Sequence, residues 1–227
     1  MLNLQLIRKE EISDNIYSFY FKNTDLLKWK AGQYIQLIIP HEQPDNRGIK
    51  RFFTISSAPF EETIVITTRI ETVNSSSFKK ALNELKSGSI IECSQPNGKF
   101  ILEDLSIKIV FIAGGIGITP IRSILADMFH NRKLFKADLL YANRDADFAF
   151  KNEIEEISAS MDNFKIHYFI SPRRISEEEL DKIYENYDSK IYYLSGPVNM
   201  IKAIEKIFYE KGVTKENIRT DYFPGYN

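Results

Sequence analysis

The spacing of hydrophobic residues changes near residue 105, and this change constrains the fold more than any other feature. Before it, apolar residues recur at the short intervals of strands, in runs bounded by turn-forming stretches such as "HEQPDNRG" and "QPNG". After it, short apolar runs alternate with amphipathic ones. A chain of 227 residues is long enough for each part to bury its own core. We therefore expect two domains, residues 1–104 and 105–227.

The pattern of the first part predicts six strands and one helix. Phe78, Leu82 and Leu85 share a face of the helix expected at residues 75–88. Several short strands at this spacing are typical of a closed or nearly closed antiparallel β-barrel. The strands are expected at residues 4–8, 16–22, 34–39, 51–56, 63–70 and 89–94.

The second part predicts an α/β fold with a doubly wound parallel sheet. Continuous apolar runs are typical of parallel strands that are buried on both faces. The ligand crevice of such a sheet lies at the carboxyl ends of its strands. Strands are expected at residues 108–113, 137–143, 165–171, 190–196 and 218–223, with helices at 119–131, 150–161, 176–187 and 198–211.

A glycine-rich turn, "GGIGITP", follows the first of these parallel strands. Gly115 and Gly117 allow close approach of a ligand to the backbone, while Thr119 suits a helix N-cap and Pro120 the first helical position. A helix N-terminus presents unpaired N–H groups and a positive dipole end, which favour a diphosphate. The alternative is a tight strand-to-helix turn without a ligand.

This turn differs from the usual dinucleotide fingerprint in two ways. Its glycines do not follow the spacing G-x-G-x-x-G. The second parallel strand ends in Asn143 and Arg144, where an acidic residue would hold the ribose of an ordinary dehydrogenase coenzyme. The sequence therefore indicates a nucleotide-binding protein of another kind.

In the first part, Arg51 begins the otherwise apolar strand "RFFTI". Its guanidinium either faces water at the strand end or binds an anion such as a diphosphate, for which its planar geometry is suited. Ser76 and Ser77 stand where the following helix begins, a second position suited to a diphosphate.

Composition excludes several classes of function. Thirty basic and 31 acidic residues leave a net charge of -1, which predicts no nucleic-acid partner. Cys93 is the single cysteine, so the sequence forms no internal disulfide and ligates no iron–sulfur cluster through cysteines, and none of the three histidines has a metal-like companion. Because no apolar run approaches the ~20 residues that span a bilayer, we expect no membrane span and a cytoplasmic location.

Four segments together resemble the ferredoxin-NADP reductase superfamily. "RFFT" resembles its R-x-Y-S/T flavin motif with Phe53 in place of tyrosine, and "LSGPVNM" resembles its C-G-P-x-x-M segment with Ser195 in place of cysteine. "WKAGQYIQL" and "GGIGITP" resemble its barrel and nicotinamide-nucleotide segments. The segments occur in the family's order and extend over essentially the whole chain.

The resemblance implies an FAD-binding barrel followed by an NAD(P)-binding domain. Arg51 would contact the FAD diphosphate together with Ser76 and Ser77, Phe53 would lie against the isoalloxazine, and Thr54 would bond near flavin N5. The glycine turn, with Gly115, Gly117, Thr119 and Pro120, would hold the nicotinamide dinucleotide, and Gly196, Pro197 and Met200 would line its nicotinamide end.

The resemblance also implies catalytic and coenzyme-selecting residues. Thr54, Ser195 and Asp221 are the implied catalytic residues, and Phe223 and Tyr226 would join the active-site rim. Tyr226 either stacks on the flavin or frays at the terminus. For the 2'-phosphate of NADPH, the resemblance points to Ser171, Arg173 and Arg174. Arg144, at the end of the second parallel strand, is a further candidate for cofactor binding. The alternative for these arginines is a solvated surface.

The implied function is a reductase that uses FAD and either NADPH or NADH, with a slight preference for NADPH. Because the chain has no cluster-ligating cysteines, electrons would pass to a separate acceptor, either a ferredoxin, flavodoxin, oxygenase component or heme protein or a small molecule. A monomer is expected. Two alternatives stay open, a reductase of free flavin or ferric chelates and a non-catalytic nucleotide-binding subunit.

Overall fold

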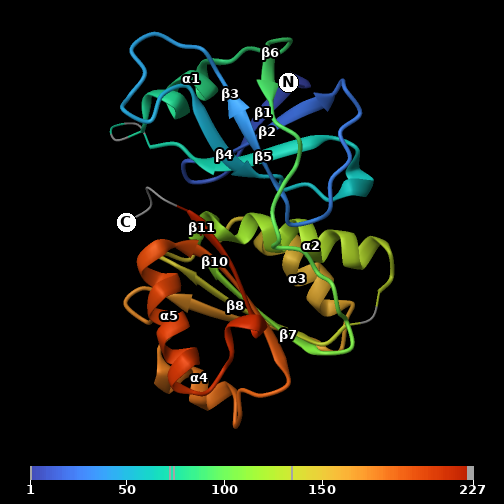
Figure 1. Ribbon diagram of the computed structural model, residues 1–227, viewed down its shortest axis with the longest axis vertical. Helices are drawn as coiled ribbons and strands as arrows, with labels where there is room; N and C mark the ends of the chain where they lie inside the picture. Colours follow the sequence, from blue (N-terminus) through green and yellow to red (C-terminus); the bar gives the residue numbers. More distant parts are fainter. Residues whose placement is uncertain (1, 72, 74, 134, 224–227) are drawn as a thin grey trace.

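The computed structural model describes residues 2–71, 73, 75–133 and 135–223, and leaves the side chain of Phe223 undescribed. The chain forms two units, one above the other in Figure 1. We call strands β1 to β6 with helix α1 the barrel unit, and strands β7 to β11 with helices α2 to α5 the sheet unit. The boundary predicted at residues 104/105 falls in the segment that joins β6 to β7.

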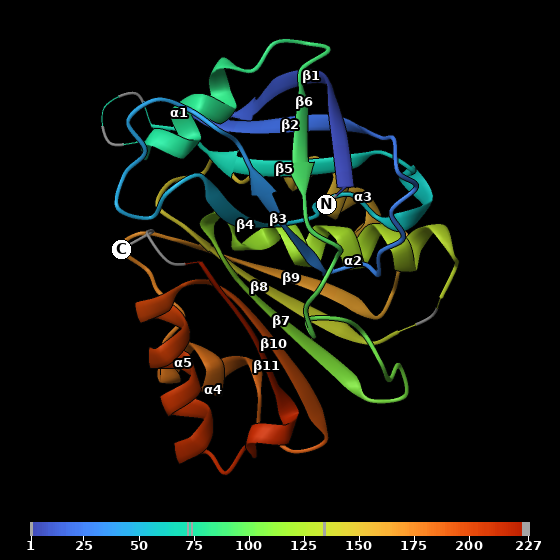
Figure 2. The ribbon, with the colours of Figure 1, turned by 45° about the horizontal axis from the view of Figure 1, so that its top comes forward.

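The barrel unit is an antiparallel sheet of six strands in the order β4-β3-β6-β1-β2-β5 (Figure 2). A bridge between Ile55 and Ile66 joins the two ends of this order, so the sheet is nearly closed, as predicted. Helix α1 (Ser77–Glu84) buries Phe78 and Leu82 fully against the barrel core. The strands are β1 (Leu2–Ser13), β2 (Ile16–Asn23), β3 (Tyr34–Ile38), β4 (Lys50–Thr54), β5 (Ile64–Arg69) and β6 (Ile90–Cys93).

The sheet unit is the predicted doubly wound parallel sheet, with strand order β11-β10-β7-β8-β9. The chain runs from β7 outward to β9 and then returns to β10 on the other side of β7. The switch point, where such sheets bind ligands, therefore lies between the carboxyl ends of β7 and β10. The strands are β7 (Lys108–Gly114), β8 (Ala137–Asn143), β9 (Phe164–Ile170), β10 (Lys190–Pro197) and β11 (Ile218–Phe223).

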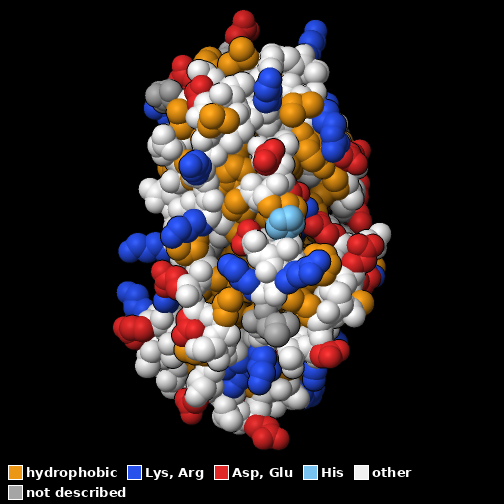
Figure 3. Space-filling view, turned by 90° about the vertical axis from the view of Figure 1, so that its right-hand side faces the viewer, with side chains coloured by type: hydrophobic (Ala, Val, Ile, Leu, Met, Phe, Trp, Pro, Cys, Tyr) orange, Lys and Arg blue, Asp and Glu red, His pale blue; other side chains and the backbone are white. Residues whose placement is uncertain are grey.

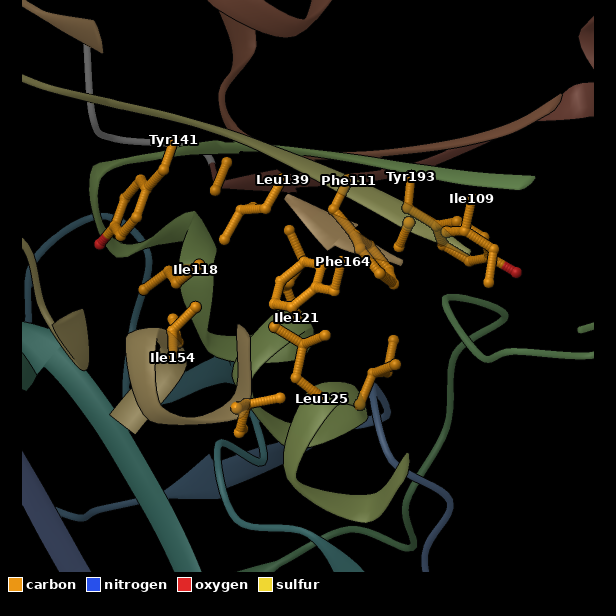
Figure 4. Close-up of a cluster of buried hydrophobic side chains, with 14 of the residues drawn as sticks. Ile109, Phe111, Ile118, Ile121, Leu125, Leu139, Tyr141, Ile154, Phe164 and Tyr193 are labelled. Atoms are coloured by element: carbon orange, nitrogen blue, oxygen red, sulfur yellow. The ribbon is translucent and has the colours of Figure 1, made fainter. Parts of the chain in front are cut away.

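Helices cover both faces of this sheet. Helices α2 (Ile118–His130) and α3 (Lys151–Ala159) lie on the face toward the barrel unit, and α4 (Glu177–Ile183) and α5 (Val198–Glu210) lie on the other (Figure 1). Side chains of α2 and α3 meet those of the strands in a continuous core (Figure 4). Complete burial of one large aliphatic side chain there stabilises the fold by about 1.5–3 kcal/mol.

Three elements differ most in length from the prediction. Strand β1 extends over Leu2–Ser13. Residues 8–11 are charged and exposed, but they stay in the strand because β2 pairs with β1 as far as Ser13. Helix α1 ends at Glu84, and α4 ends at Ile183, where the backbone of Tyr184 turns to an extended conformation. Helical periodicity continues past both ends in the sequence, so tertiary packing decides where these helices stop.

Several contacts hold the two units against each other. The Ser57 carbonyl accepts hydrogen bonds from Ser123 Oγ at 2.7 Å and from Trp29 Nε1 at 3.1 Å. Tyr193 donates its hydroxyl to the Ile101 carbonyl at 2.8 Å and meets the Phe100 ring edge-on. The bond from Ser123 joins α2 to the segment that follows β4.

The surface carries charges of both signs. On the face seen in Figure 3, basic and acidic side chains are interspersed, with hydrophobic side chains between them. Among the described residues, no helix combines the length and the apolar character that crossing a bilayer requires.

Candidate cofactor-binding site

A pocket of about 380 Å³ opens beside β4 and β5 of the barrel unit, and residues of the sheet unit complete its wall. It brings together five residues that the sequence singled out, namely Arg51, Phe53, Thr54, Ser76 and Asp221. The sequence analysis missed other residues of the wall. Most come from neighbouring strands and loops without a motif, while Tyr34 and Ile116 stand inside quoted segments but were not singled out themselves. The missed residues include Tyr34, Arg47, Arg69, Ser75, Lys79, Ile116 and Tyr222.

Arg51 is buried in the pocket wall, with 6% of its surface exposed. Its Nη1 donates to the carbonyls of Arg47, Gly48 and Lys50 at 2.7–2.8 Å, and its Nη2 pairs with Asp45 Oδ1 at 2.5 Å. The buried Nε has no hydrogen-bond partner among the described residues. An unpaired N–H on a buried cation is costly unless an acceptor joins it, so this wall is suited to an anion.

Helix α1 begins beside Arg51. Ser76 is its N-cap and accepts a hydrogen bond from the Lys79 N–H at 3.3 Å. Ser77 lies elsewhere, because its hydroxyl accepts the Asp45 N–H at 2.9 Å and lies 3.0 Å from His41 Nε2. The structure therefore brings Ser76 to the pocket and uses Ser77 to anchor the loop before β4.

Thr54 and Asp221 connect the two units inside the pocket. Thr54 Oγ1 donates to Asp221 Oδ2 at 3.2 Å, between residues 167 positions apart. Burial raises the pKa of Asp221 to about 6, although the Thr54 hydroxyl acts in the opposite direction. Asp221 therefore exchanges its proton close to neutral pH, beside Thr54.

The pKa of Asp221 predicts a pH dependence of stability. Folding favours the protonated form of the Asp221 carboxyl. The stabilisation that this carboxyl contributes is therefore complete below the pKa that it has in the unfolded chain, and it is lost as pH rises through 6. Relative to Asp221→Asn, the free energy of unfolding of the wild type should fall by about 2–3 kcal/mol between pH 4 and pH 7. Urea titrations of both proteins at several pH values measure this difference. A difference that does not change with pH would contradict it.

The glycine turn is packed against the end of β10 and the start of α5. A Cβ at Gly117 would lie 2.3 Å from the Ser195 carbonyl oxygen, and one at Gly114 would lie 2.6 Å from Met200 Cε. Gly196 has φ +151°, and a Cβ there would lie 3.0 Å from the Gly114 nitrogen. Only glycines allow the backbones to meet this closely at the switch point.

The start of α2 corrects one expectation. The helix begins at Ile118, directly after the 3₁₀ turn Gly115–Gly117, so Thr119 is not the N-cap and Pro120 is not the first helical residue. Thr119 is buried and donates its hydroxyl to the Ile116 carbonyl at 3.1 Å. The 3₁₀ turn leads straight into the helix, so no capping side chain is needed.

Ser195 is completely buried near the end of β10. In the sheet register it stands between Ala113 of β7 and Asp221 of β11. Its Oγ has no hydrogen-bond partner among the described residues. Pro197 and Met200 follow it at the start of α5, so these predicted residues gather at the switch point next to Asp221.

The predicted coenzyme-selecting residues lie on exposed loops after β8 and β9. Arg173 pairs with Glu179 and lies over the Phe169 ring, 4.7 Å from its centroid. The Ser171 N–H donates to the Asn143 carbonyl at 3.1 Å, which joins the two loops. Arg144 is exposed. The side chain of Phe223 and all of Tyr226 lie outside the described residues.

Comparison with known families shows what this arrangement is. Residues 3–101 match the model of the oxidoreductase FAD-binding domain, and residues 111–206 match that of the oxidoreductase NAD-binding domain. The fold resembles that of ferredoxin-NADP+ reductase from Plasmodium falciparum, with a TM-score of 0.81 and 20% identity over 98% of this chain and 96% of that one. The chain belongs to the oxidoreductases that join an FAD-binding domain to an NAD-binding domain.

Other proteins similar to this oxidoreductase are larger than it or of the same size. Flavohemoprotein A of Dictyostelium discoideum is 29% identical over 95% of this chain, which spans 58% of that relative's length. NADH-cytochrome b5 reductase 1 of Emericella nidulans is 28% identical over 94% of this chain, and the match covers 75% of that relative's length. The flavohem-like FAD/NAD-binding domain of nitric oxide dioxygenase from Vibrio cholerae has the same fold, with a TM-score of 0.83, 21% identity and 98% of both chains covered.

The residues of this two-domain oxidoreductase fit the two cofactors after which its domains are named. In the FAD-binding domain, the unpaired Nε of Arg51 and the start of α1 lie in one pocket wall and suit a diphosphate. In the NAD-binding domain, the glycine turn lies at the switch point. Ile116 of that turn lines the same pocket, so the two binding regions adjoin.

Proposed function

We propose that the protein is an NAD(P)H-dependent, FAD-containing reductase that passes electrons to a separate acceptor. The observation that carries this proposal is the shared pocket, whose wall combines Arg51 and Thr54 of the FAD-binding domain with Ile116 and Asp221 of the other unit. Bound FAD would supply the ability to accept a hydride and to release electrons singly or in pairs. The protein's own contribution is binding and orientation.

Each residue has a defined task in this proposal. Arg51 and Ser76 bind the FAD diphosphate, and Phe53 and Thr54 contact the ring system. Gly115 and Gly117 allow the nicotinamide dinucleotide to approach the backbone at the start of α2. Gly196, Pro197 and Met200 line its nicotinamide end.

Asp221 and Ser195 are the proposed polar groups of the reaction centre. With a pKa of about 6, Asp221 holds a proton on its carboxyl in part of the molecules near neutral pH, and its Oδ2 is already oriented by Thr54. The charged side chains that share its pocket wall are Arg47, Arg51, Arg69, Glu71 and Lys79. The buried Ser195 hydroxyl, which has no partner in the part of the chain that the structure describes, offers a hydrogen bond at the nicotinamide end.

Relatives' names support a heme protein as acceptor within the broader class of protein or small-molecule acceptors. They include flavohemoproteins, an NADH-cytochrome b5 reductase and the cytochrome P450 reductase GcoB of Amycolatopsis. A monomeric state and a cytoplasmic location stay predictions from the sequence.

The first test is the visible spectrum of the purified protein, before and after anaerobic addition of NADPH or NADH. We expect the absorption of bound oxidised flavin, which bleaches with either coenzyme. A protein that is colourless and that FAD cannot reconstitute would support the non-catalytic alternative instead. Turnover confined to free flavin or ferric chelates would support the alternative reductase.

The same experiment tests coenzyme preference. We propose NADPH as the preferred coenzyme, because Arg144 and Arg174 are exposed after β8 and β9 and no acidic residue ends β8. Exposed charge pairs contribute little, so kcat/KM with NADPH should exceed that with NADH by about two- to fivefold. Replacing Arg144 and Arg174 by alanine should remove this difference. Equal turnover of the wild type with both coenzymes would contradict the preference.

A further inference from the structure

Arg122 of α2 lies between the two units, with 15% of its side chain exposed. Within the sheet unit it is held by Glu153 of α3. Its Nε donates to Glu153 Oε2 at 2.9 Å, and its Nη2 pairs with Oε1 at 2.6 Å. These two contacts bind one edge of the guanidinium to the Glu153 carboxylate and orient its other edge toward the barrel unit.

The other edge of the guanidinium binds the barrel unit. Nη2 donates to Glu61 Oε1 at 3.1 Å, while Nη1 pairs with Oε2 of the same carboxylate and donates to the Ser56 carbonyl at 3.1 Å. Glu61 ends the 3₁₀ turn Pro59–Glu61, where its carboxylate also accepts the Ala58 N–H at 2.5 Å. A single planar cation is therefore bidentate to two carboxylates, one from each unit.

The position of Arg122 gives this contact a functional meaning. Arg122 lies in the second turn of the helix that the glycine turn begins, and Ser56 follows shortly after Thr54, the last residue of β4. The guanidinium thus joins the glycine turn to the strand of Thr54 through short, stiff segments. A shift at this contact moves Asp221 relative to Thr54, whose oxygens lie 3.2 Å apart across the same boundary.

We propose that Arg122, through Glu61 and the Ser56 carbonyl, is a positioning residue that sets the nicotinamide half of the site against the flavin half. This inference rests on the proposed function, since the distance that it controls matters for hydride transfer. Glu153 only pre-orients the guanidinium within its own unit. Glu61 and Glu153 differ in whether their contact with Arg122 crosses between the units, and Glu61 alone of the two also accepts the Ala58 N–H.

The experiment compares Glu61→Gln with Glu153→Gln, which remove the same charge from the same guanidinium. A misplacement of about 1 Å at a reacting centre costs as much as 100-fold, and a partial loosening by Glu61→Gln should lower the limiting rate of flavin reduction about tenfold. The dissociation constants of FAD and coenzyme should stay within about twofold, as expected for loss of one partly exposed charge pair. Glu153→Gln should keep the wild-type rate within about twofold.

A distance measurement provides a readout that is independent of activity. Spin labels at Ile90→Cys in β6 and Tyr209→Cys in α5 report on the separation of the units, because both positions are exposed. Cys93 is completely buried, and burial raises the pKa of its thiol to about 11, so it stays unlabelled. We expect the distance distribution to broaden with Glu61→Gln and to stay narrow with Glu153→Gln.

The outcomes separate this inference from the proposed function. A wild type that does not reduce FAD would overturn the proposed function, and the distances would then decide whether Arg122 sets the separation of the units. A wild type that reduces FAD, with an unchanged rate and distance in Glu61→Gln, would overturn the inference. Equal slowing by both variants would also overturn the inference, because the contact between the units would then matter no more than the contact within the sheet unit. Thermal unfolding of each variant confirms that the protein compared is folded.

Discussion

Replacing Arg51 by glutamine should weaken FAD binding about 100-fold, because hydrogen bonds to a charged group contribute about 1.5–3 kcal/mol each. Its guanidinium is buried in the pocket wall, and its Nε donates to no acceptor among the described residues. Arg51→Lys should recover only part of the affinity, since an ammonium keeps the charge but not the planar fork. Titration of the apoprotein with FAD, followed by quenching of flavin fluorescence, measures the dissociation constant.

The matched control for this substitution is Arg8→Gln in β1. Arg8 also lies on a barrel strand, where it pairs with Glu10 and stacks over the Tyr20 ring, but it is absent from the pocket wall. Arg51→Gln also removes hydrogen bonds to three backbone carbonyls and to Asp45. The unfolding curve of this variant is therefore measured together with its affinity for FAD. If the folded Arg51→Gln protein bound FAD as Arg8→Gln does, Arg51 would have no role in holding the diphosphate.

Gly117→Ala is the second substitution with a large expected effect, and it acts on the coenzyme half of the site. Gly117 has φ -61°, which alanine adopts without strain, so the whole effect arises from its methyl group. That methyl would lie 2.3 Å from the Ser195 oxygen and 2.7 Å from Gly196 Cα, both backbone atoms. The glycine turn and the Ser195 segment must separate, and kcat/KM for NAD(P)H should fall about 100-fold.

FAD content and the free energy of unfolding distinguish this effect from general damage. Overpacking in a core costs about 1–3 kcal/mol, so the variant should fold and keep its FAD. Gly88→Ala is the control, since Gly88 has φ +91° and its Cβ would meet nothing within 4 Å. That control should lose stability through backbone strain alone, about 1–3 kcal/mol, and keep its turnover. Normal coenzyme turnover in Gly117→Ala would show that the close contact is dispensable.

Much of the fold was predictable because its signals are local. The buried runs of β7, β8 and β10 are mainly apolar, as is typical of parallel strands, and the amphipathic helices between them leave few other arrangements. The barrel followed from the short strand spacing. Helix ends were less predictable, as α1 and α4 show, since their final turns depend on what the next segment packs against.

The candidate site was predictable only where a motif marks it. Arg51, Thr54 and Asp221 stand in or near recognisable segments, and the structure brings them into one pocket. Arg69 and Lys79 line the same pocket without any motif, because closure of the barrel brings β5 to β4 and packing of α1 on the barrel core brings Lys79 there. Ser77 stands next to Ser76 in sequence yet binds Asp45 and His41, since one position further along the helix points its hydroxyl to another neighbour.

The sequence by itself determined the two kinds of sheet, the glycine turn and the identity of the polar residues, because each depends on neighbours along the chain. The tertiary structure alone decided which of these residues meet. Thr54 reaches Asp221 across 167 positions, and Arg122 reaches Glu61 across 61. Such contacts depend on how the two units are placed against each other, and that placement arises from packing across their whole interface, which no local pattern encodes.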